Sequence, residues 1–203
     1  MSPEATSPTK GERTAARLLD CAESLFAERG YEGTSLRAIA GAAGIREPGL
    51  YNYFAGKEAL YAAVLERALA PMAAAIRDHR EAGVAGYARL PEVMIDLLLA
   101  HPQMASLFQQ ALRGEPDSPG NRLLREWLDR LFTLGMDTLR DLGAEDVEPA
   151  DMAIQVIALF NLTTGYFLSQ RAFESMAEGE ITDPVNLERQ KKLLRRIQRA
   201  LIL

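Results

Sequence analysis

Apolar side chains recur every three or four positions through most of this chain, which is the spacing of one face of an amphipathic helix. Leu18, Ala22 and Phe26 share such a face, and Gly30 follows them as a helix stop. No segment shows the sustained alternation of apolar and polar residues that a half-buried strand would have. The pattern therefore predicts an all-α fold of about nine helices. The expected helices cover residues 9–29, two short stretches within 34–54, residues 57–80, a segment opened by Pro91, a segment from Pro102 to Gly114, and residues 121–142, 149–176 and 184 to the end.

Prolines mark where several of these helices should begin. Pro91, Pro102 and Pro184 each suit a first helical turn, because proline has no N–H and the N–H groups of a first turn have no partner inside the helix. Pro71 is different, since it falls inside the helix expected over residues 57–80. We expect Pro71 to kink or interrupt that helix.

Between residues 34 and 54 the pattern predicts two short helices joined by a tight turn. Ile39 belongs to the apolar stripe of the first helix. Gly44 stands where the chain must turn, and glycine adopts the left-handed conformation at little cost. Pro48 then suits the first turn of the second helix, which directs Leu50 inward. This arrangement is a helix-turn-helix, the unit that lays its second helix in the major groove of DNA.

At these residues the chain resembles the TetR family of bacterial repressors. The resemblance covers residues 13–65, about a quarter of the chain. It implies a DNA-binding head at residues 10–57 and a ligand-binding, dimerising body at residues 58–203, and we expect the Ser/Thr/Pro-rich residues 1–9 to be a disordered arm. The matching positions are Gly30, Thr34, Ile39-Ala40, Ala43-Gly44-Ile45, Leu50-Tyr51, Tyr53-Phe54 and Lys57-Glu58-Ala59-Leu60.

The resemblance implies that side chains on the outer face of the head contact DNA. The Arg37 guanidinium can form two hydrogen bonds to the edge of a guanine base or to a phosphate. Many family members have a serine cap where Arg46 stands, so Glu47 is expected to cap the second helix instead. Lys57, beside the free N–H groups that start the next helix, is expected to bind phosphate. Tyr53 is open between DNA contact and core packing. The expected DNA contacts are Thr34, Arg37, Arg46, Glu47, Pro48, Gly49, Tyr51, Asn52, Tyr53 and Lys57.

The helix expected over residues 149–176 is apolar on more than one side, which implies burial on more than one side. Either it is a central core helix, or it has a subunit interface on one side and a ligand chamber on the other. The resemblance favours the second interpretation, because the last two helices of the TetR-like fold usually form a four-helix dimer interface. The expected interface residues are Ala158, Asn161, Gly165, Leu194, Ile197 and Leu201. The expected ligand-lining residues are Met104, Phe108, Trp127, Phe160, Thr164 and Phe167, which suit a mostly apolar ligand.

The charge of the chain is unusual for a protein that binds DNA, since its 203 residues carry a net charge of −5. Residues 1–57 hold seven Lys or Arg and seven Asp or Glu, so the head is neutral and the excess negative charge lies in the body. Phosphate binding depends on where the basic residues stand rather than on the total. An acidic body is repelled by the duplex, which favours approach by the head.

Several other kinds of chemistry lack a signal. The chain has no nucleophile-elbow, P-loop or dinucleotide motif, so no enzyme is expected. His79 and His101 have no cysteine or carboxylate at ligand spacing, and neither a metal nor a cofactor is expected. The single cysteine, Cys21, excludes an intrachain disulfide. No apolar run reaches the roughly 18 residues of a membrane span, and residues 1–9 are no secretory signal, so we expect a cytoplasmic protein without membrane contact.

The leading hypothesis is a ligand-responsive transcriptional regulator. As a homodimer it would bind a palindromic operator in double-stranded DNA as a repressor, and a small, mostly apolar effector would release it. The alternative is a lipid- or isoprenoid-binding protein on the same fold that does not bind DNA. Arg37, Tyr51 and Lys57 favour the first hypothesis, because a DNA-binding head needs such residues.

Overall fold

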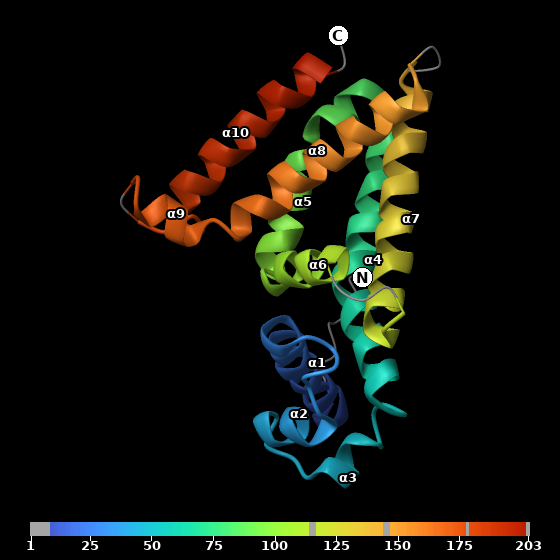
Figure 1. The fold of residues 1–203 in the computed structure, drawn as a ribbon, viewed down its shortest axis with the longest axis vertical. Helices are drawn as coiled ribbons and strands as arrows, with labels where there is room; N and C mark the ends of the chain where they lie inside the picture. Colours follow the sequence, from blue (N-terminus) through green and yellow to red (C-terminus); the bar gives the residue numbers. More distant parts are fainter. Residues whose placement is uncertain (1–8, 114–116, 144–146, 178, 202–203) are drawn as a thin grey trace, which may run out of the picture.

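The computed structural model describes residues 9–113, 117–143, 147–177 and 179–201 (Figure 1). Within these ranges the fold is all-helical, as the hydrophobic pattern predicts, and no strand is present. Ten helices follow one another where about nine are expected. They are α1 (Lys10–Arg29), α2 (Leu36–Ala42), α3 (Glu47–Leu50), α4 (Lys57–Glu81), α5 (Gly83–Ala100), α6 (Gln103–Arg113), α7 (Pro119–Asp141), α8 (Pro149–Phe167), α9 (Gln170–Glu174) and α10 (Pro184–Leu201).

The first helix has the boundaries that its sequence predicts. The Thr9 hydroxyl accepts from the N–H of Glu12, and the Glu12 carboxylate accepts from the N–H of Thr9, which is a reciprocal capping box. Gly30 ends the helix with a φ of +73°, in the left-handed region that favours glycine. The arm expected at residues 1–9 lies outside the described residues except for Thr9, which begins the helix.

Two prolines lie inside helices. α4 continues through Pro71 without interruption, and α5 begins at Gly83, well before Pro91. The prediction that Pro91 opens a helix is therefore wrong. The reason is Gly86, which reads as a helix breaker in the sequence but is buried against α4: a Cβ on it would lie 2.1 Å from the carbonyl oxygen of His79. Glycine here lets two helices approach closely.

The helix expected over residues 149–176 is two helices, which accounts for the tenth. α8 ends at Phe167, where the N–H groups of Leu168 and Ser169 bond to carbonyls three residues back instead of four. The Ser169 hydroxyl also donates to the carbonyl of Gly165 at 2.7 Å. The Tyr166 hydroxyl in turn donates to the Ile181 carbonyl and ties α8 to the segment before α10.

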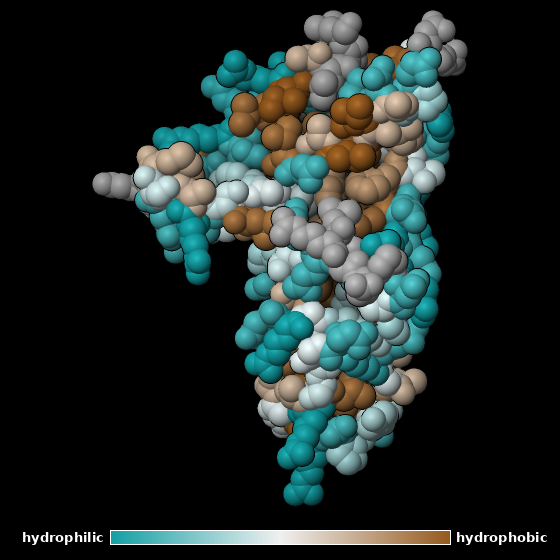
Figure 2. Space-filling view, in the orientation of Figure 1, coloured by the Kyte–Doolittle hydropathy of each residue, from teal (hydrophilic) through white to brown (hydrophobic). Residues whose placement is uncertain are grey.

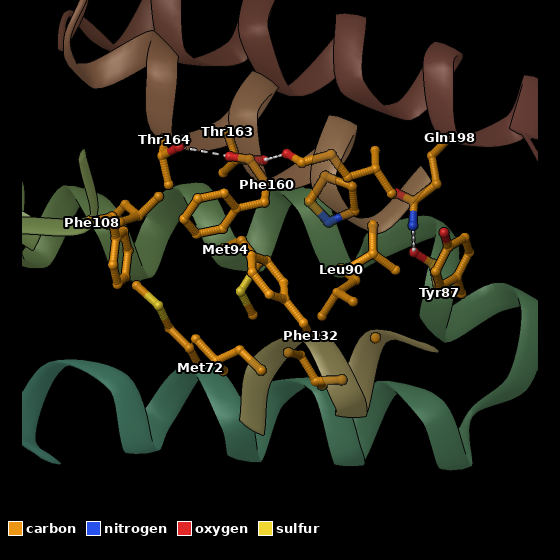
Figure 3. A pocket seen from close by; sticks show the side chains of 17 residues that line it. Met72, Tyr87, Leu90, Met94, Phe108, Phe132, Phe160, Thr163, Thr164 and Gln198 are labelled. Atoms are coloured by element: carbon orange, nitrogen blue, oxygen red, sulfur yellow. Dashed lines mark hydrogen bonds between the residues drawn. The ribbon is translucent and has the colours of Figure 1, made fainter. Parts of the chain in front are cut away.

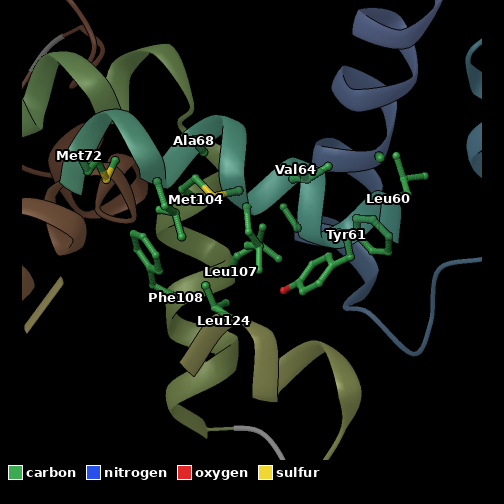
Figure 4. Close-up of a cluster of buried hydrophobic side chains, with 14 of the residues drawn as sticks. Leu60, Tyr61, Val64, Ala68, Met72, Met104, Leu107, Phe108 and Leu124 are labelled. Atoms are coloured by element: carbon green, nitrogen blue, oxygen red, sulfur yellow. The ribbon is translucent and has the colours of Figure 1, made fainter. Parts of the chain in front are cut away.

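The helices form a small head and a larger body that share one apolar core. In Figure 1 the head, α1 to α3, lies below the body, and α4 runs from the head up through the body beside α7. A single cluster of buried side chains extends from Leu18 and Phe26 of α1 through Leu65 of α4 to Leu107 of α6 and Leu124 of α7. Figure 4 shows the part of this cluster where α4 faces α6. The packing of α4 therefore sets the position of the head relative to the body.

α4 is also the one helix among the described residues that is long and apolar enough, by length and composition alone, to cross a membrane. However, 56% of its apolar stretch is buried inside the protein, where it packs against α5 and α7. That is the environment of a core helix.

Candidate functional site

Local hydrogen bonds shape the helix-turn-helix in the head. The Ser35 hydroxyl accepts from the N–H of Ala38 and caps α2. Gly44 has a φ of +68° in the turn, and the Ile45 N–H donates to the Ala40 carbonyl at 3.0 Å. α3 is a single turn, anchored by the fully buried side chain of Leu50. The unit therefore has the geometry that the sequence predicts, and it lies at the free end of the head (Figure 1).

Six of the ten predicted DNA contacts are exposed around α2 and α3. Tyr51 is 53% exposed and Tyr53 is 38% exposed, so both rings face solvent and neither fills the core. Arg37 and Arg46 form no ion pair among the described residues, which leaves both guanidinium groups free for an incoming anion. The exposed six are Arg37, Arg46, Pro48, Tyr51, Asn52 and Tyr53, while Glu47 and Gly49 are half-buried.

Glu47 does not cap α3, contrary to the prediction. Arg46 occupies the cap position with φ −79° and ψ 145°, Glu47 is the first helical residue, and no side chain caps the helix. The physical reason is that a capping side chain accepts hydrogen bonds from backbone N–H groups of the first turn, and these are missing or already bonded here. Pro48 has no N–H, and the N–H of Gly49 already donates to the Arg46 carbonyl at 2.9 Å. A capping side chain would therefore find little to bind.

Thr34 is not available to DNA, which corrects a second prediction. Its side chain is only 2% exposed. Its hydroxyl lies 2.8 Å from the Gly30 carbonyl oxygen and 3.0 Å from that of Leu25. It therefore bonds to carbonyl groups around the end of α1 and ties the start of the helix-turn-helix to that helix.

Replacing Thr34 by valine is expected to destabilise the protein by about 1–2 kcal/mol, because the Leu25 and Gly30 carbonyls lose a donor while the shape of the side chain is kept. Thr14→Val is the matched control. Its hydroxyl bonds to a carbonyl on the exposed part of α1, so its loss should cost less than about 0.5 kcal/mol. Urea unfolding of both variants measures the difference, and equal stabilities would contradict this role of Thr34.

Lys57 opens α4 next to the helix-turn-helix. Its ammonium lies 4.4 Å from the centre of the Tyr31 ring and 3.4 Å from the Glu32 carbonyl oxygen. No side chain caps α4, since Gly56 holds the cap position. The ammonium and the first N–H groups of α4 therefore form an electropositive corner that suits a phosphate.

The body contains an apolar cavity of about 120 Å³ (Figure 3). Side chains of α4 to α8 and α10 line it, and none of the lining residues is charged. Phe108 and Phe160 contact each other there with ring centres 5.2 Å apart. A space of this kind suits a small uncharged molecule.

Three of the six predicted ligand-lining residues, Phe108, Phe160 and Thr164, line this cavity. Met104 is instead fully buried in the shared core near the head, and the Trp127 ring lies 4.4 Å from the Arg130 guanidinium. Phe167 packs edge-on against Tyr166, toward α10. Helical spacing does not reveal which apolar side of a buried helix meets a cavity, and this explains the error.

Sequence reasoning also missed two polar lining residues, Tyr87 of α5 and Gln198 of α10. Tyr87 lies between residue 80 and Pro91, where no helix was expected. Gln198 lies on a helix that the sequence assigned to the dimer interface. A glutamine inside the apolar stripe of α10 is the one signal that could have found it.

An apolar surface extends over α8 and α10. Ile154 is 64% exposed and Ile157 is 47% exposed, and the space next to Gly165 is open. Figure 2 shows hydrophobic side chains gathered over these helices in the upper half of the molecule. The exposed apolar residues of α8 and α10 are Ile154, Ile157, Leu162, Val185 and Leu193, and the predicted interface residues Ala158, Asn161 and Gly165 lie on α8 as well.

The predicted interface residues of α10 need a correction. Leu194 is fully buried inside the chain, in a cluster with Ile95 and Leu187, so it cannot contact a partner. Ile197 is half-buried, and the side chain of Leu201 lies outside the described residues. The inner face of α10 packs on α5 and α8 of its own chain, which the sequence pattern cannot distinguish from a seam between chains.

The described residues hold no group of three or more His, Cys, Asp or Glu side chains that could bind a metal ion. His101 is half-buried, and its Nδ1 lies 2.9 Å from the Glu23 carboxylate. A carboxylate only accepts, so this nitrogen carries the proton and the contact is structural.

Residues 18–64 match the family model described as "Bacterial regulatory proteins, tetR family". The transcriptional regulator RutR of Escherichia coli is 34% identical over 120 residues, which cover 53% of this chain and 55% of RutR. The chain thus aligns with about half the length of this relative.

The fold is similar to those of solved regulators along nearly the whole chain. The TetR-family regulator PfmR of Thermus thermophilus superposes with a TM-score of 0.64 at 23% identity, covering 97% of both chains. FadR of Bacillus subtilis, solved in complex with stearoyl-CoA, superposes with a TM-score of 0.65 at 16% identity, covering 90% of this chain and 96% of that one. At these identities the likeness concerns the fold alone.

Proposed function

We propose that this chain, which belongs to the TetR family of bacterial regulatory proteins through its N-terminal domain, is a transcriptional repressor that a small ligand releases from DNA. The observation that carries the proposal is the exposed set of Arg37, Arg46 and Asn52 around α3, at the free end of the head. Side chains of these types, presented by a helix-turn-helix, read base edges in the major groove. As a regulator of transcription, the protein would act in the cytoplasm and would have no enzymatic activity.

The contacts divide by chemistry. Asn52 and the two arginines are suited to base edges, because an amide pairs with adenine and a guanidinium pairs with guanine. Lys57 and the start of α4 are suited to phosphate, which supplies affinity without sequence information. Tyr51 can bind a phosphate or pack on a thymine methyl group.

The exposed apolar surface of α8 and α10 supports a homodimer. A monomer would leave Ile154, Ile157 and Leu193 in water, and Figure 2 shows apolar side chains gathered over α8 and α10, the kind of patch that usually marks an interface. A second copy offers the same surface, and a two-fold dimer would pair α8 and α10 with their counterparts. Its two recognition helices would stand roughly 34–36 Å apart, one turn of a palindromic operator.

α4 offers the route from the ligand to the DNA. Met72 and Ile76 of α4 line the cavity, and the same helix begins at Lys57 beside the helix-turn-helix. A ligand that favours one arrangement of α4 would change the spacing of the two heads. A preference of about 2–3 kcal/mol for the arrangement that does not bind DNA would weaken operator binding about 30- to 150-fold.

The ligand we propose is smaller than the stearoyl-CoA in the FadR complex. A cavity of about 150 Å³ is large enough for benzene. The cavity here, at about 120 Å³, is of that order. The body therefore suits a compact, mostly apolar effector.

Selection from random duplex DNA tests the proposal directly. The purified full chain should enrich a palindromic sequence at moderate salt, because the head carries both base-reading and phosphate-binding groups. If no sequence is enriched, the protein is not a sequence-specific regulator.

Variants then separate the two kinds of contact on the selected operator. Asn52→Ala should lose about 1–3 kcal/mol on the operator and little on random DNA. Lys57→Ala should weaken binding to both and lower the salt slope by about one unit. Arg77→Ala, exposed on the part of α4 that lies in the body, is the matched control and should change neither. Fluorescence anisotropy over a salt series measures all three.

A further inference from the structure

Two buried polar side chains meet at one end of the cavity. Tyr87 of α5 is 3% exposed and Gln198 of α10 is 1% exposed, and Figure 3 shows both at the end opposite Phe108 and Thr164. The Tyr87 hydroxyl and the Gln198 side-chain oxygen have no hydrogen-bond partner among the described residues. Buried polar groups in proteins are rarely left without a partner.

Pro91 fixes the orientation of the Gln198 amide. The Tyr87 carbonyl would normally accept from the N–H four residues later, but that residue is Pro91, which has no N–H. The Gln198 Nε2 donates to this carbonyl at 2.6 Å instead. Since a carbonyl only accepts, the amide nitrogen must face it, and Gln198 Oε1 is left as an acceptor with no donor among the described residues.

The other polar lining groups are already satisfied. The Thr163 hydroxyl donates to the Leu159 carbonyl at 2.7 Å, and the Thr164 hydroxyl donates to the Phe160 carbonyl at 2.8 Å. Burial raises the pKa of the Tyr87 phenol above its usual range, and the Gln198 side chain, which lies within reach of the hydroxyl but outside hydrogen-bond geometry, opposes this in part, so the hydroxyl keeps its proton. The unmet hydrogen bonds therefore lie at one end of an otherwise apolar space.

We propose that the cavity binds a neutral, ring-sized molecule with one hydroxyl group, placed between Tyr87 and Gln198. A hydroxyl can accept from the Tyr87 O–H and donate to Gln198 Oε1 at the same time. The cavity of about 120 Å³ holds a single ring, and the absence of charged lining residues excludes an ionised ligand. The phenols are the class that combines these properties.

This ligand class rests on the proposed role of the cavity, and it adds a bridge between helices. Tyr87 belongs to α5, which packs on α4, and Gln198 belongs to α10, which carries part of the apolar surface assigned to the dimer. A ligand hydroxyl bonded to both would hold α10 against α5. Ligand binding would thus change the packing of α10 at the dimer surface and of α5 against α4.

Calorimetric titration of the full chain with phenol and with toluene tests the proposal, because a hydroxyl and a methyl group are nearly equal in size. Wild-type protein should bind phenol more tightly than toluene. Fluorobenzene, which has no hydrogen to donate, should bind like toluene. Tyr87→Phe should lower the ratio of the toluene Kd to the phenol Kd at least tenfold, since a site that hydrogen-bonds a hydroxyl rejects its apolar analogue.

Thr138→Val is the matched control, because Thr138 is buried outside the cavity lining and its hydroxyl already bonds to the Leu134 carbonyl within its own helix, so the ratio should stay within about twofold of wild type. An unchanged ratio in Tyr87→Phe overturns the proposal, as does a wild-type protein that binds neither ring or prefers toluene. The titration contains no DNA. Failure to select an operator would therefore remove the proposed regulator without touching the result on phenol, and the two failures are distinguishable.

Discussion

Arg67→Met is expected to destabilise the protein by about 3–5 kcal/mol, because it leaves the buried carboxylate of Glu23 without its cation. The side chain of Glu23 on α1 is 7% exposed, and its Oε2 accepts from Arg67 Nη2 of α4 at 2.7 Å. The same oxygen accepts from His101, the residue that follows α5, at 2.9 Å. This ionic cluster joins the head to the body. For a chain of this size the melting temperature should fall by roughly 6–20 °C, which calorimetry measures.

Two further variants separate the buried pair from its surroundings. Arg67 also bonds Asp20 at 2.7 Å, but Asp20 is largely exposed, so Asp20→Ala should cost less than about 1 kcal/mol. The double variant Arg67→Met with Glu23→Leu should recover most of the loss, because it removes both charges together. If the double variant is no more stable than Arg67→Met, the lost stability comes from packing and not from an unpaired charge.

Ile157→Glu is expected to yield a folded monomer whose operator affinity is lower by about 10²–10⁴-fold. Ile157 is 47% exposed in the single chain, so a glutamate there remains solvated in the monomer. In the proposed dimer it would be buried without a partner, which is strongly unfavourable. A monomer holds only one half-site and loses the gain of two linked contacts. Sedimentation and anisotropy measure the two effects.

Thr133→Glu is the control for this change of charge. Thr133 is exposed on α7, outside the apolar surface of α8 and α10, and its replacement should leave both the dimer and operator binding intact. A dimer that survives Ile157→Glu would place the subunit interface on another surface.

The helix-turn-helix could be predicted from the sequence because it is held by contacts between near neighbours. The Ser35 cap, the left-handed Gly44 and the inward Leu50 each act within a few residues of their own position. The helical content follows in the same way from apolar spacing. The exposure of Arg37 on α2 also follows, since a short amphipathic helix has only one polar side.

Thr34 and Leu194 show where such reasoning fails. The Thr34 hydroxyl bonds to the carbonyl groups of Leu25 and Gly30 around the end of α1. Leu194 packs in a buried cluster with Ile95, almost one hundred residues earlier in the chain. A pattern along one helix tells that a face is apolar. It does not tell whether that face meets its own chain, a second chain or a cavity.

The sequence by itself determined the helical fold, the helix-turn-helix and most of the side chains that the head presents, because periodicity and turn residues act locally. Only the tertiary structure decided where the cavity lies and what lines it. Pro91 removes one N–H from α5, and Gln198 of α10 supplies the missing donor from 111 residues away. That pairing leaves an acceptor in an apolar space, and it exists only because packing brings α5 and α10 together.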